Sequence, residues 1–296
     1  AVRQAVLAVK SGLVETALVV GVEKMTDQTG PPVVAAMASG LDADYEAVHG
    51  QTMAGAGALL MQRYMHEFGV EVADFAGFSV NAHANGAENP LAMFRNRLKA
   101  ERFAMAPLVA DPVSLFDAAP IGDGAAAVIV TSSERAADMV PNPVEIAGSA
   151  LATDTIGLHD RRDVMYLAAA ATSAQEAMEA AGVTAEDIDL FELHDAFTVM
   201  AALSLEAAGF AERGEGWKLA RDGEIGRDGR IPISTLGGLK ARGNPMGATG
   251  VYQVVEVAQQ LRGQAEACQI DGARVGMTQN LGGSGATAVT HILRIN

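Results

Sequence analysis

The stretch "GGLKARGNPMGATGVYQ", residues 237–253, carries the most information about the fold of this chain. Asn244 and Pro245 turn the chain, and the glycines at 247 and 250 allow other backbone to approach closely. The apolar residues that follow recur at helical spacing and predict a helix with one buried face, formed by Val251, Val254, Val255 and Ala258. Backbone N–H groups at the start of such a helix favour an anion or a carbonyl oxygen. A tight structural turn would use the same residues, so this stretch alone leaves both interpretations open.

The composition excludes several classes of protein. The chain has 296 residues, of which 49% are hydrophobic, so it can bury a full core and is long enough for two domains. It has no apolar run of about 18 residues and no basic-then-apolar start, so no membrane span or export signal is expected. The formal charge of -15 opposes attraction to nucleic acid. One cysteine, and no zinc-type spacing of Cys and His, predict a cytoplasmic protein without disulfide or metal cofactor.

Strand-like runs alternate with Ala-rich helical runs, which predicts an α/β fold. The expected strands lie at residues 17–25, 124–132, 187–193, 273–281 and 285–295. Residues 1–12, "AVRQAVLAVKSG", read as the interior of an apolar helix with no capping residue before it; its expected buried residues are Val2, Ala5, Val6 and Val9. We therefore expect a preceding segment, which could include a targeting signal.

Two parts of the chain echo each other. "VRQAVLAV" followed by "ALVVGVE" is similar to "VYQVVEVA" followed by "ARVGMTQN", and "DGAAAVIV" is similar to "SGATAVTH". This predicts an internal duplication, with an N-terminal half at residues 1–142 and a C-terminal half at residues 143–296. From about residue 26 to residue 112 the sequence changes to glycines, methionines, polar helices and irregular loops. This segment is expected to be a loop domain inserted in the first half. The prolines of "MVPNPVEI", residues 139–146, mark the join.

Two further loops are candidates for a site. His194 follows the apolar run "LFEL" and precedes a predicted helix, so its side chain is expected in the crevice where α/β proteins bind ligands. In a structural alternative, Asp195 is the N-cap of that helix and His194 has no chemical role. "QNLGGSGAT", residues 279–287, predicts a glycine-rich hairpin and has neither the GxGxxG pattern nor the P-loop lysine of a phosphate site.

Together these loops resemble the thiolase superfamily, in particular its branch of archaeal and sterol-carrier-protein-X or lipid-transfer-type thiolases. "HDAF" at 194–197, "GGLKARGNPMGATG" at 237–250 and "QNLGGSGATAV" at 279–289 come in that family's order. The match extends to "NAHANGAENPLAMFR" at 81–95 and "PIGDGAAAVIV" at 120–130. The resemblance implies a thiolase-like five-layer α/β fold, with two duplicated halves, an inserted loop domain and, here, a truncated first half.

The resemblance also assigns roles. In thiolases a cysteine at the N-terminus of a buried helix carries the acyl group. The matching helix is residues 1–12, so that cysteine would precede Ala1. His194 matches the oxyanion-hole position that stabilises the enolate of the CoA thioester. The backbone N–H of Gly282 matches a donor of a second oxyanion hole, which would also need the N–H of the cysteine.

At two positions the chain departs from the family pattern. Asn244 stands where thiolases have the histidine of a GHP motif, so it could donate a hydrogen bond to the enolate oxygen but could not take a proton. Asn280 stands where biosynthetic thiolases have a second catalytic cysteine, and it likewise could not act as a base. Cys268 matches no catalytic position. The expected site residues are His194, Asn244, Asn280 and Gly282.

Other polar residues are weaker candidates. Lys240, Arg242, Arg161 and Arg162 could contact CoA phosphates, although short basic pairs are usually solvated surface. His83 could line a substrate tunnel or have a structural role.

The function implied by the resemblance is that of an acyl-CoA enzyme of the acetyl-CoA C-acyltransferase type in lipid metabolism. It would make or break a carbon-carbon bond next to a CoA thioester, with no cofactor. Two alternatives stay open: a cysteine-independent aldolase acting on a steroid or lipid acyl-CoA, and a non-catalytic CoA-binding scaffold. The expected partners are a second copy of the chain, as a homodimer or dimer of dimers, and a small acyl-CoA-binding OB-fold protein.

Overall fold

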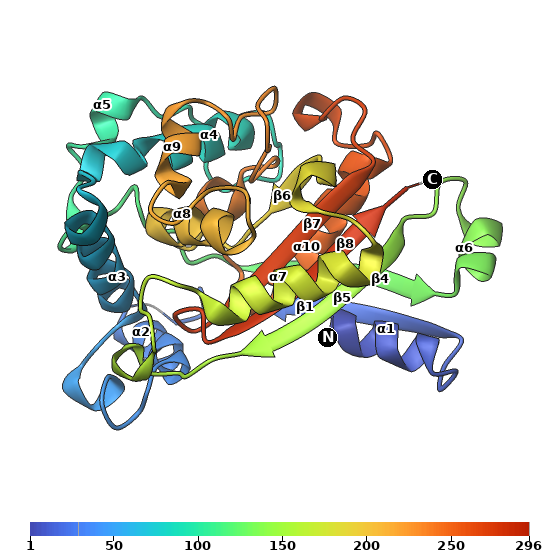
Figure 1. Ribbon diagram of the computed structural model, residues 1–296, viewed down its shortest axis with the longest axis horizontal. Helices are drawn as coiled ribbons and strands as arrows, with labels where there is room; N and C mark the ends of the chain where they lie inside the picture. Colours follow the sequence, from blue (N-terminus) through green and yellow to red (C-terminus); the bar gives the residue numbers. More distant parts are fainter. Residues whose placement is uncertain (29, 296) are drawn as a thin grey trace.

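The computed structural model describes residues 1–28 and 30–295 (Figure 1). Its helices are α1 (Val2–Lys10), α2 (Pro31–Met37), α3 (Met53–Phe68), α4 (Ala76–Gly86), α5 (Ala100–Phe103), α6 (Ser133–Met139), α7 (Ala168–Ala181), α8 (Thr198–Ala207), α9 (Gly216–Arg221) and α10 (Met246–Leu261). Its strands are β1 (Thr16–Glu23), β2 (Leu108–Ala110), β3 (Val113–Ser114), β4 (Gly124–Thr131), β5 (Glu145–Thr153), β6 (Leu190–Glu192), β7 (Val275–Gly282) and β8 (Thr287–Arg294). A π-helical turn, η6 (Gly238–Arg242), precedes α10.

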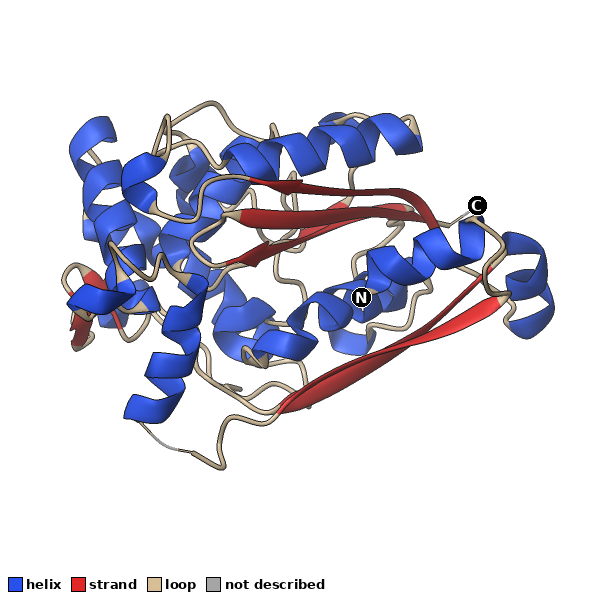
Figure 2. Cartoon of the chain, turned by 90° about the horizontal axis from the view of Figure 1, so that it is seen from below, coloured by secondary structure: helices blue, strands red, loops and turns tan. Residues whose placement is uncertain are grey.

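The strands form two main sheets with helices between them. One sheet has the order β5-β8-β7-β6, in which β6 runs parallel to β7 and the other neighbours are antiparallel. The other sheet is the antiparallel pair β1-β4. Helices α1 and α10 contact both sheets, and α7 packs against β5 and β8 from the other side. Figure 2 shows this layering along the sheet edges. The described residues thus supply four successive layers: helix, sheet, helix, sheet.

The five strands predicted from the sequence are confirmed, with ends that differ by a few residues. Strand β5 was not predicted, because its sequence "EIAGSALAT" is rich in small residues with weak strand preference. Its small residues have a packing reason. A Cβ added to Gly148 would lie 1.9 Å from the carbonyl oxygen of Ala177 in α7, so helix and strand approach as closely as backbones can.

A helix-strand-strand unit occurs twice in the fold. Helix α1 is followed by β1, which pairs antiparallel with β4, and α10 is followed by β7, which pairs antiparallel with β8. Both helices lie in the layer between the sheets. This is the arrangement that a duplication would produce, and the division at residue 142 stays a prediction. The residues between β1 and β4 include α2 to α5, and α3 and α4 pack against α8.

The outer face of the β1-β4 pair is apolar and exposed. Leu18, Val20, Val22 and Ile129 are each more than half exposed, whereas Val19 on the opposite face is buried against the helical layer. Within residues 1–28 and 30–295 no helix is long and apolar enough to cross a bilayer.

Candidate active site

A single cavity of about 370 Å³ contains all four residues proposed from the sequence. His194 comes from the segment between β6 and α8, Asn244 from the turn before α10, and Asn280 and Gly282 from the end of β7. Most of the remaining wall is apolar, and it includes Met37, Met53, Met200 and Met246. Residues separated by up to 88 positions therefore meet in one apolar pocket, because three loops end at the same edge of the fold.

His194 is neutral at physiological pH. Burial lowers the pKa of its imidazole to about 4, and the positive charge of Arg242 acts in the same direction. Its Nδ1 atom lies 3.2 Å from Nδ2 of Asn280. A neutral imidazole still carries one N–H, so His194 can donate a hydrogen bond without bringing a charge into the pocket.

Asp195 does not cap the next helix. The N-cap position of α8 is Phe197, and no side chain caps it. The buried Asp195 carboxylate instead accepts a hydrogen bond from the backbone N–H of Leu239 at 2.7 Å and one from Oγ of Ser234 at 3.1 Å. Asp195 thus ties the histidine segment to η6, and the N-cap alternative was wrong.

Asn244 is held from two sides. Its backbone N–H donates to the carbonyl oxygen of Pro120 at 3.2 Å, and its Oδ1 accepts from Oγ1 of Thr249, in the first turn of α10, at 2.9 Å. Among the described residues Nδ2 of Asn244 has no hydrogen-bond partner, and the residue lines the cavity. The amide is therefore oriented with its N–H donors available to a ligand.

The glycine-rich turn after β7 is held by Arg161. Its guanidinium donates to both the carbonyl oxygen and Oγ of Ser284, each at 2.9 Å, and the residue is buried. A Cβ added to Gly283 would lie 2.4 Å from the carbonyl oxygen of Gly40, which fixes the other side of the turn. Arg161 is thus a support of the cavity wall and not a contact for CoA phosphates. Arg162 is exposed, and its proposed contact stays a prediction.

Arg242 and Lys240 are also buried, contrary to a phosphate-binding role. Nε of Arg242 lies 2.7 Å from Oε1 of Glu256, and both side chains are almost completely buried. Nζ of Lys240 donates to the carbonyl oxygens of Leu115 and Ala118 at 2.9 and 2.7 Å. Burial lowers the pKa of Lys240 to about 8. Neither cation is free to meet a phosphate.

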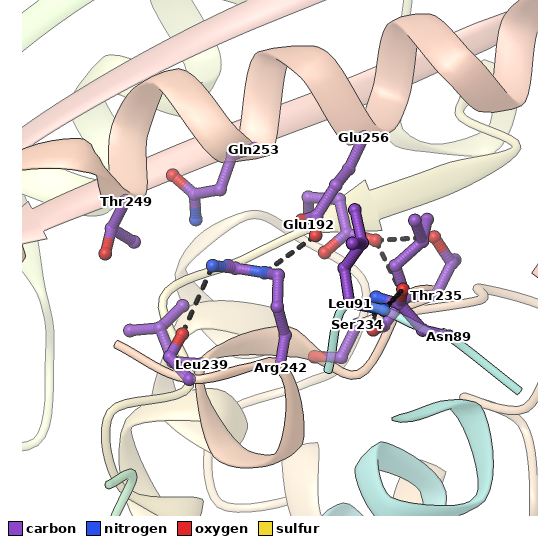
Figure 3. Close-up of polar contacts among 12 residues, drawn as sticks. Asn89, Leu91, Glu192, Ser234, Thr235, Leu239, Arg242, Thr249, Gln253 and Glu256 are labelled. Carbon is purple, nitrogen blue, oxygen red and sulfur yellow. Dashed lines mark hydrogen bonds and ion pairs between the residues drawn. The ribbon is translucent and has the colours of Figure 1, made fainter. Parts of the chain in front are cut away.

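Glu192 lies in a buried polar group with Thr235, Arg242 and Glu256 (Figure 3). Its Oε1 accepts from the backbone N–H and the hydroxyl of Thr235 at 2.7 and 2.6 Å. Burial, together with the nearby charge of Glu256, raises the pKa of Glu192 to about 8. Burial also raises the pKa of Glu256, to about 7, so the two carboxyls titrate as a pair. Because Glu256 lies 2.7 Å from Arg242, we assign the negative charge to Glu256 and the proton to Glu192.

His83, a weak candidate, and Cys268, which was not proposed as a site residue, both lie outside the cavity. Nδ1 of His83 is 3.0 Å from the carbonyl oxygen of Asn96, and its ring stacks on Phe94. Cys268 is buried in a short turn, with Sγ 3.5 Å from the carbonyl oxygen of Asn85. Neither residue lines the cavity, so both have packing roles. Within residues 1–28 and 30–295, no three His, Cys, Asp or Glu side chains gather in a way that could hold a metal ion.

Comparison with known proteins identifies the family. A family profile described as Thiolase C-terminal domain-like matches residues 150–295. An acetyl-CoA acetyltransferase of Methanothermobacter thermautotrophicus is 44% identical over 292 residues, a match that covers 99% of this chain and 76% of the relative. The chain belongs to the thiolase superfamily. A second archaeal acetyl-CoA acetyltransferase, from Methanocaldococcus jannaschii, is 37% identical with the same coverage. Sterol carrier protein 2 of Rattus norvegicus is 32% identical over 234 residues, which cover 77% of this chain and 43% of that protein. This thiolase therefore lies in the predicted branch of archaeal and sterol-carrier or lipid-transfer-type thiolases and is an enzyme of the thiolase-type acyltransferase family.

A solved structure with a similar fold belongs to a protein that is named for a different activity. The protein named Ltp2-ChsH2(DUF35) aldolase superposes with a TM-score of 0.86 and 25% identity, over 99% of this chain and 76% of that chain. The thiolase-like α/β fold predicted from the sequence is thereby confirmed, and the described residues supply four of its five expected layers.

Sequence reasoning missed the polar residues behind the thiolase cavity. Gln253 and Glu256 lie on α10, and Glu192 lies in β6. A signal was present in each case. Glu192 is the only charged residue of the run "LFEL", and Gln253 and Glu256 interrupt the apolar pattern of "VYQVVEVA" at a spacing of three. Polar and charged residues within otherwise buried elements are expected to have a hydrogen-bond or ion-pair partner.

Proposed function

We propose that this thiolase stabilises the enolate of an acyl-CoA thioester while a carbon-carbon bond next to the thioester is made or broken. The observation that carries the proposal is the meeting of His194 and Asn244 in one apolar cavity. A neutral imidazole N–H and an amide N–H are donors of the kind that stabilise charge developing on a thioester oxygen. Because both are neutral, the pocket favours a substrate oxygen that becomes negative only during the reaction.

The roles follow from what each group can do. Nε2–H of His194 and Nδ2–H of Asn244 would donate to the enolate oxygen. The backbone N–H of Gly282 would be one donor of a second oxyanion hole, which binds the carbonyl oxygen of an acyl intermediate. Asn280 can neither accept nor release a proton at neutral pH, so it would act by orienting the His194 ring. The apolar wall would exclude water and so strengthen the two hydrogen bonds.

Exchange of the acyl-CoA α-protons tests this assignment. Protein incubated with acetyl-CoA in D2O is expected to incorporate deuterium above the buffer rate, and mass spectrometry measures the uptake. A base of the buffer would take the α-proton, the two donors would stabilise the enolate, and D2O would return a deuteron to the α-carbon. His194→Ala and Asn244→Ala should each reduce the uptake on the order of 10²-fold, since each removes one donor from a preorganised site. His291→Gln is the matched control, because His291 is also buried and neutral but does not line the cavity. Uptake equal to buffer in the unaltered protein would leave only the scaffold function.

A second candidate is aldol cleavage of a β-hydroxyacyl-CoA without a cysteine nucleophile. It is favoured by the structural similarity to a protein named as an aldolase and by the amides at positions 244 and 280. The one cysteine, Cys268, is buried away from the cavity, so residues 1–296 are expected to be inactive in acetoacetyl-CoA thiolysis. Release of an aldehyde from a β-hydroxyacyl-CoA would support the aldolase, whereas robust thiolysis would show that the nucleophile was assigned wrongly.

The setting of the reaction is part of the proposal. We place it in lipid metabolism in the cytoplasm, with the chain paired to a second copy and joined by a small OB-fold protein that binds acyl-CoA. The net charge of -15 makes a basic docking face on that protein favourable. Co-purification of the two proteins, followed by size-exclusion chromatography with light scattering, measures the composition of the complex.

A further inference from the structure

We infer that Gln253, which lies behind the cavity, fixes the tautomer of His194 through Asn280, so that Nε2–H and not a lone pair faces the substrate oxygen. Gln253 is a positioning residue in this scheme, because it touches neither the cavity nor a substrate. The inference deepens the proposed function and rests on it. It follows in three steps: the orientation of the Gln253 amide determines that of the Asn280 amide, and the Asn280 amide determines the tautomer of His194.

The amide of Gln253 has only one possible orientation. Its Nε2 atom lies 3.0 Å from the carbonyl oxygen of Leu193 and 2.9 Å from that of Gln279. Carbonyl oxygens only accept hydrogen bonds, so the two N–H groups of the amide must point at them. If the amide were turned over, its oxygen would face two acceptors while buried, at 1% exposure. Oε1 of Gln253 is therefore left as an acceptor facing Asn280.

The orientation of Asn280 follows from that acceptor. Its Nδ2 atom lies 3.2 Å from Oε1 of Gln253 and 3.2 Å from Nδ1 of His194. Turning this amide over would bring its oxygen against the oxygen of Gln253, where neither atom has a proton to share. Nδ2 must then donate one proton to Gln253 and the other to His194.

The tautomer of His194 is the last step. Nδ1 faces a donor, so it must be the unprotonated, accepting nitrogen of the neutral ring. The single ring proton is therefore on Nε2. Among the described residues Nε2 has no hydrogen-bond partner, and His194 lines the cavity. The other tautomer would present a lone pair to the enolate oxygen and would repel the charge that the site has to stabilise.

Two further features support this chain of hydrogen bonds from Gln253 to His194. Gly250, on the same face of α10, has no side chain, and a Cβ there would lie 3.4 Å from Cγ of Asn280. Asn280 can thus lie against the helix that carries Gln253. The positive charge of Arg242 and the burial of the ring both keep His194 neutral, which is the state in which the choice of tautomer matters.

Nitrogen NMR of protein labelled with 15N-histidine tests the inference without any need for activity. Two-bond and three-bond correlations from the ring protons distinguish a protonated from an unprotonated nitrogen, and His194→Ala identifies the signal among the six histidines. We expect the unaltered protein to show unprotonated Nδ1 and protonated Nε2 at pH 7. A protonated Nδ1 in the unaltered protein would overturn the inference.

Matched variants of α10 test the role of Gln253. Gln253→Met removes the acceptor that orients Asn280, so a measurable fraction of His194 should move to the Nδ1–H tautomer. Gln260→Met is the control, because Gln260 lies two turns further on the same helix, is equally buried and donates to the carbonyl oxygen of Cys268 at 2.8 Å. It should leave the His194 signal unchanged. A His194 signal unaltered in folded Gln253→Met would contradict the inference.

Asn280→Asp provides a second test that does not depend on Gln253→Met folding. The introduced carboxylate can only accept, so Nδ1 of His194 should become protonated at every pH from 6 to 8. Persistence of an unprotonated Nδ1 would overturn the inference. Deuterium uptake separates this outcome from failure of the proposed function. If the unaltered protein shows no uptake above buffer, the enolate function fails, while the NMR result still decides the tautomer.

Discussion

Nε of Arg242 lies 2.7 Å from Oε1 of Glu256, and the two side chains are only 4% and 3% exposed. This ion pair joins α10, which carries Glu256, to η6, which carries Arg242. Tyr252 lies beside it, with the Arg242 guanidinium 4.7 Å from its ring centroid. A buried ion pair gives little net stability compared with apolar residues, but it is costly to break because one charge is left without a partner.

Arg242→Leu should therefore lower the free energy of unfolding by about 3–5 kcal/mol, because Glu256 would remain buried and unpaired. Equilibrium denaturation in urea measures the loss. The double variant Arg242→Leu/Glu256→Leu should recover most of it. A double variant as unstable as the single one would mean that the guanidinium stabilises the fold through other contacts.

Glu192→Gln should change how stability depends on pH. The folded protein keeps the proton of Glu192 up to a pKa of about 8, whereas the unfolded chain releases it near the ordinary value of 4.5. Between these values the folded state binds the extra proton, so stability is fully present below about pH 4.5 and is lost as pH rises toward 8. The glutamine keeps the acceptor for Thr235 and has no proton to lose. Thermal unfolding from pH 5 to 8 should show a smaller decline in the variant than in the unaltered protein, and equal declines would show that Glu192 is ionised in the fold.

Arg161→Lys should loosen the turn at 282–285. A lysine cannot supply the fixed fork of donors that holds both oxygens of Ser284. We expect faster amide hydrogen exchange in this turn and deuterium uptake into acetyl-CoA reduced on the order of tenfold, since small displacements of a site are costly. Arg162→Lys is the control, because its side chain is exposed. Equal exchange in both variants would argue against the clamp.

Gly148→Ala tests the close contact between β5 and α7. The added Cβ would overlap the carbonyl oxygen of Ala177, a backbone atom that cannot move without displacing the helix. We expect a loss of about 2 kcal/mol or more in the free energy of unfolding, or failure to fold. Gly122→Ala is the control, since the nearest atom to its added Cβ is Sδ of Met93 at 3.7 Å. Denaturation midpoints of the two variants should differ clearly.

Self-association should depend on the outer face of the β1-β4 pair. Val20 is 56% exposed in the middle of this apolar surface, and a patch of this kind with an unpaired strand edge favours a partner. Light scattering should show a dimer at micromolar concentration, and Val20→Lys should shift it toward the monomer. Leu91→Lys, at an exposed residue elsewhere, should have no effect. A monomer in the unaltered protein would contradict this expectation.

Much of the fold could be predicted because strands such as β1 and β4 contain runs of valine and isoleucine that are typical of strands. Strand β5 could not be predicted in this way. Its residues are small because α7 lies against it, and that contact is tertiary information which no local pattern carries.

The cavity residues were found through loop motifs, whereas their supports were not. Gln253 and Glu256 occupy positions that on an ordinary surface helix would face water. Helix α10 has no such face, because it lies between two sheets. The same burial shows that Arg161, Lys240 and Arg242, which were weak candidates for phosphate contacts, are not solvated surface residues either. A charged residue in a sequence is usually expected at the protein surface, and only the packing shows that these three side chains are buried.

Helix α10 also determines how the chain is expected to fold. It contacts β1 and β4 on one side and β6 and β7 on the other, and its buried polar side chains include Gln253, Glu256 and Gln260. Separating the two sheets would expose both apolar faces of the helix, and it would break the hydrogen bonds of Gln253 and Gln260 and the ion pair of Glu256. Although the sequence resembles a tandem of two similar units, neither unit has a complete core without α10. The chain is therefore expected to unfold in one cooperative transition, and a polypeptide cut at the predicted join near residue 142 should regain structure only when both pieces are mixed.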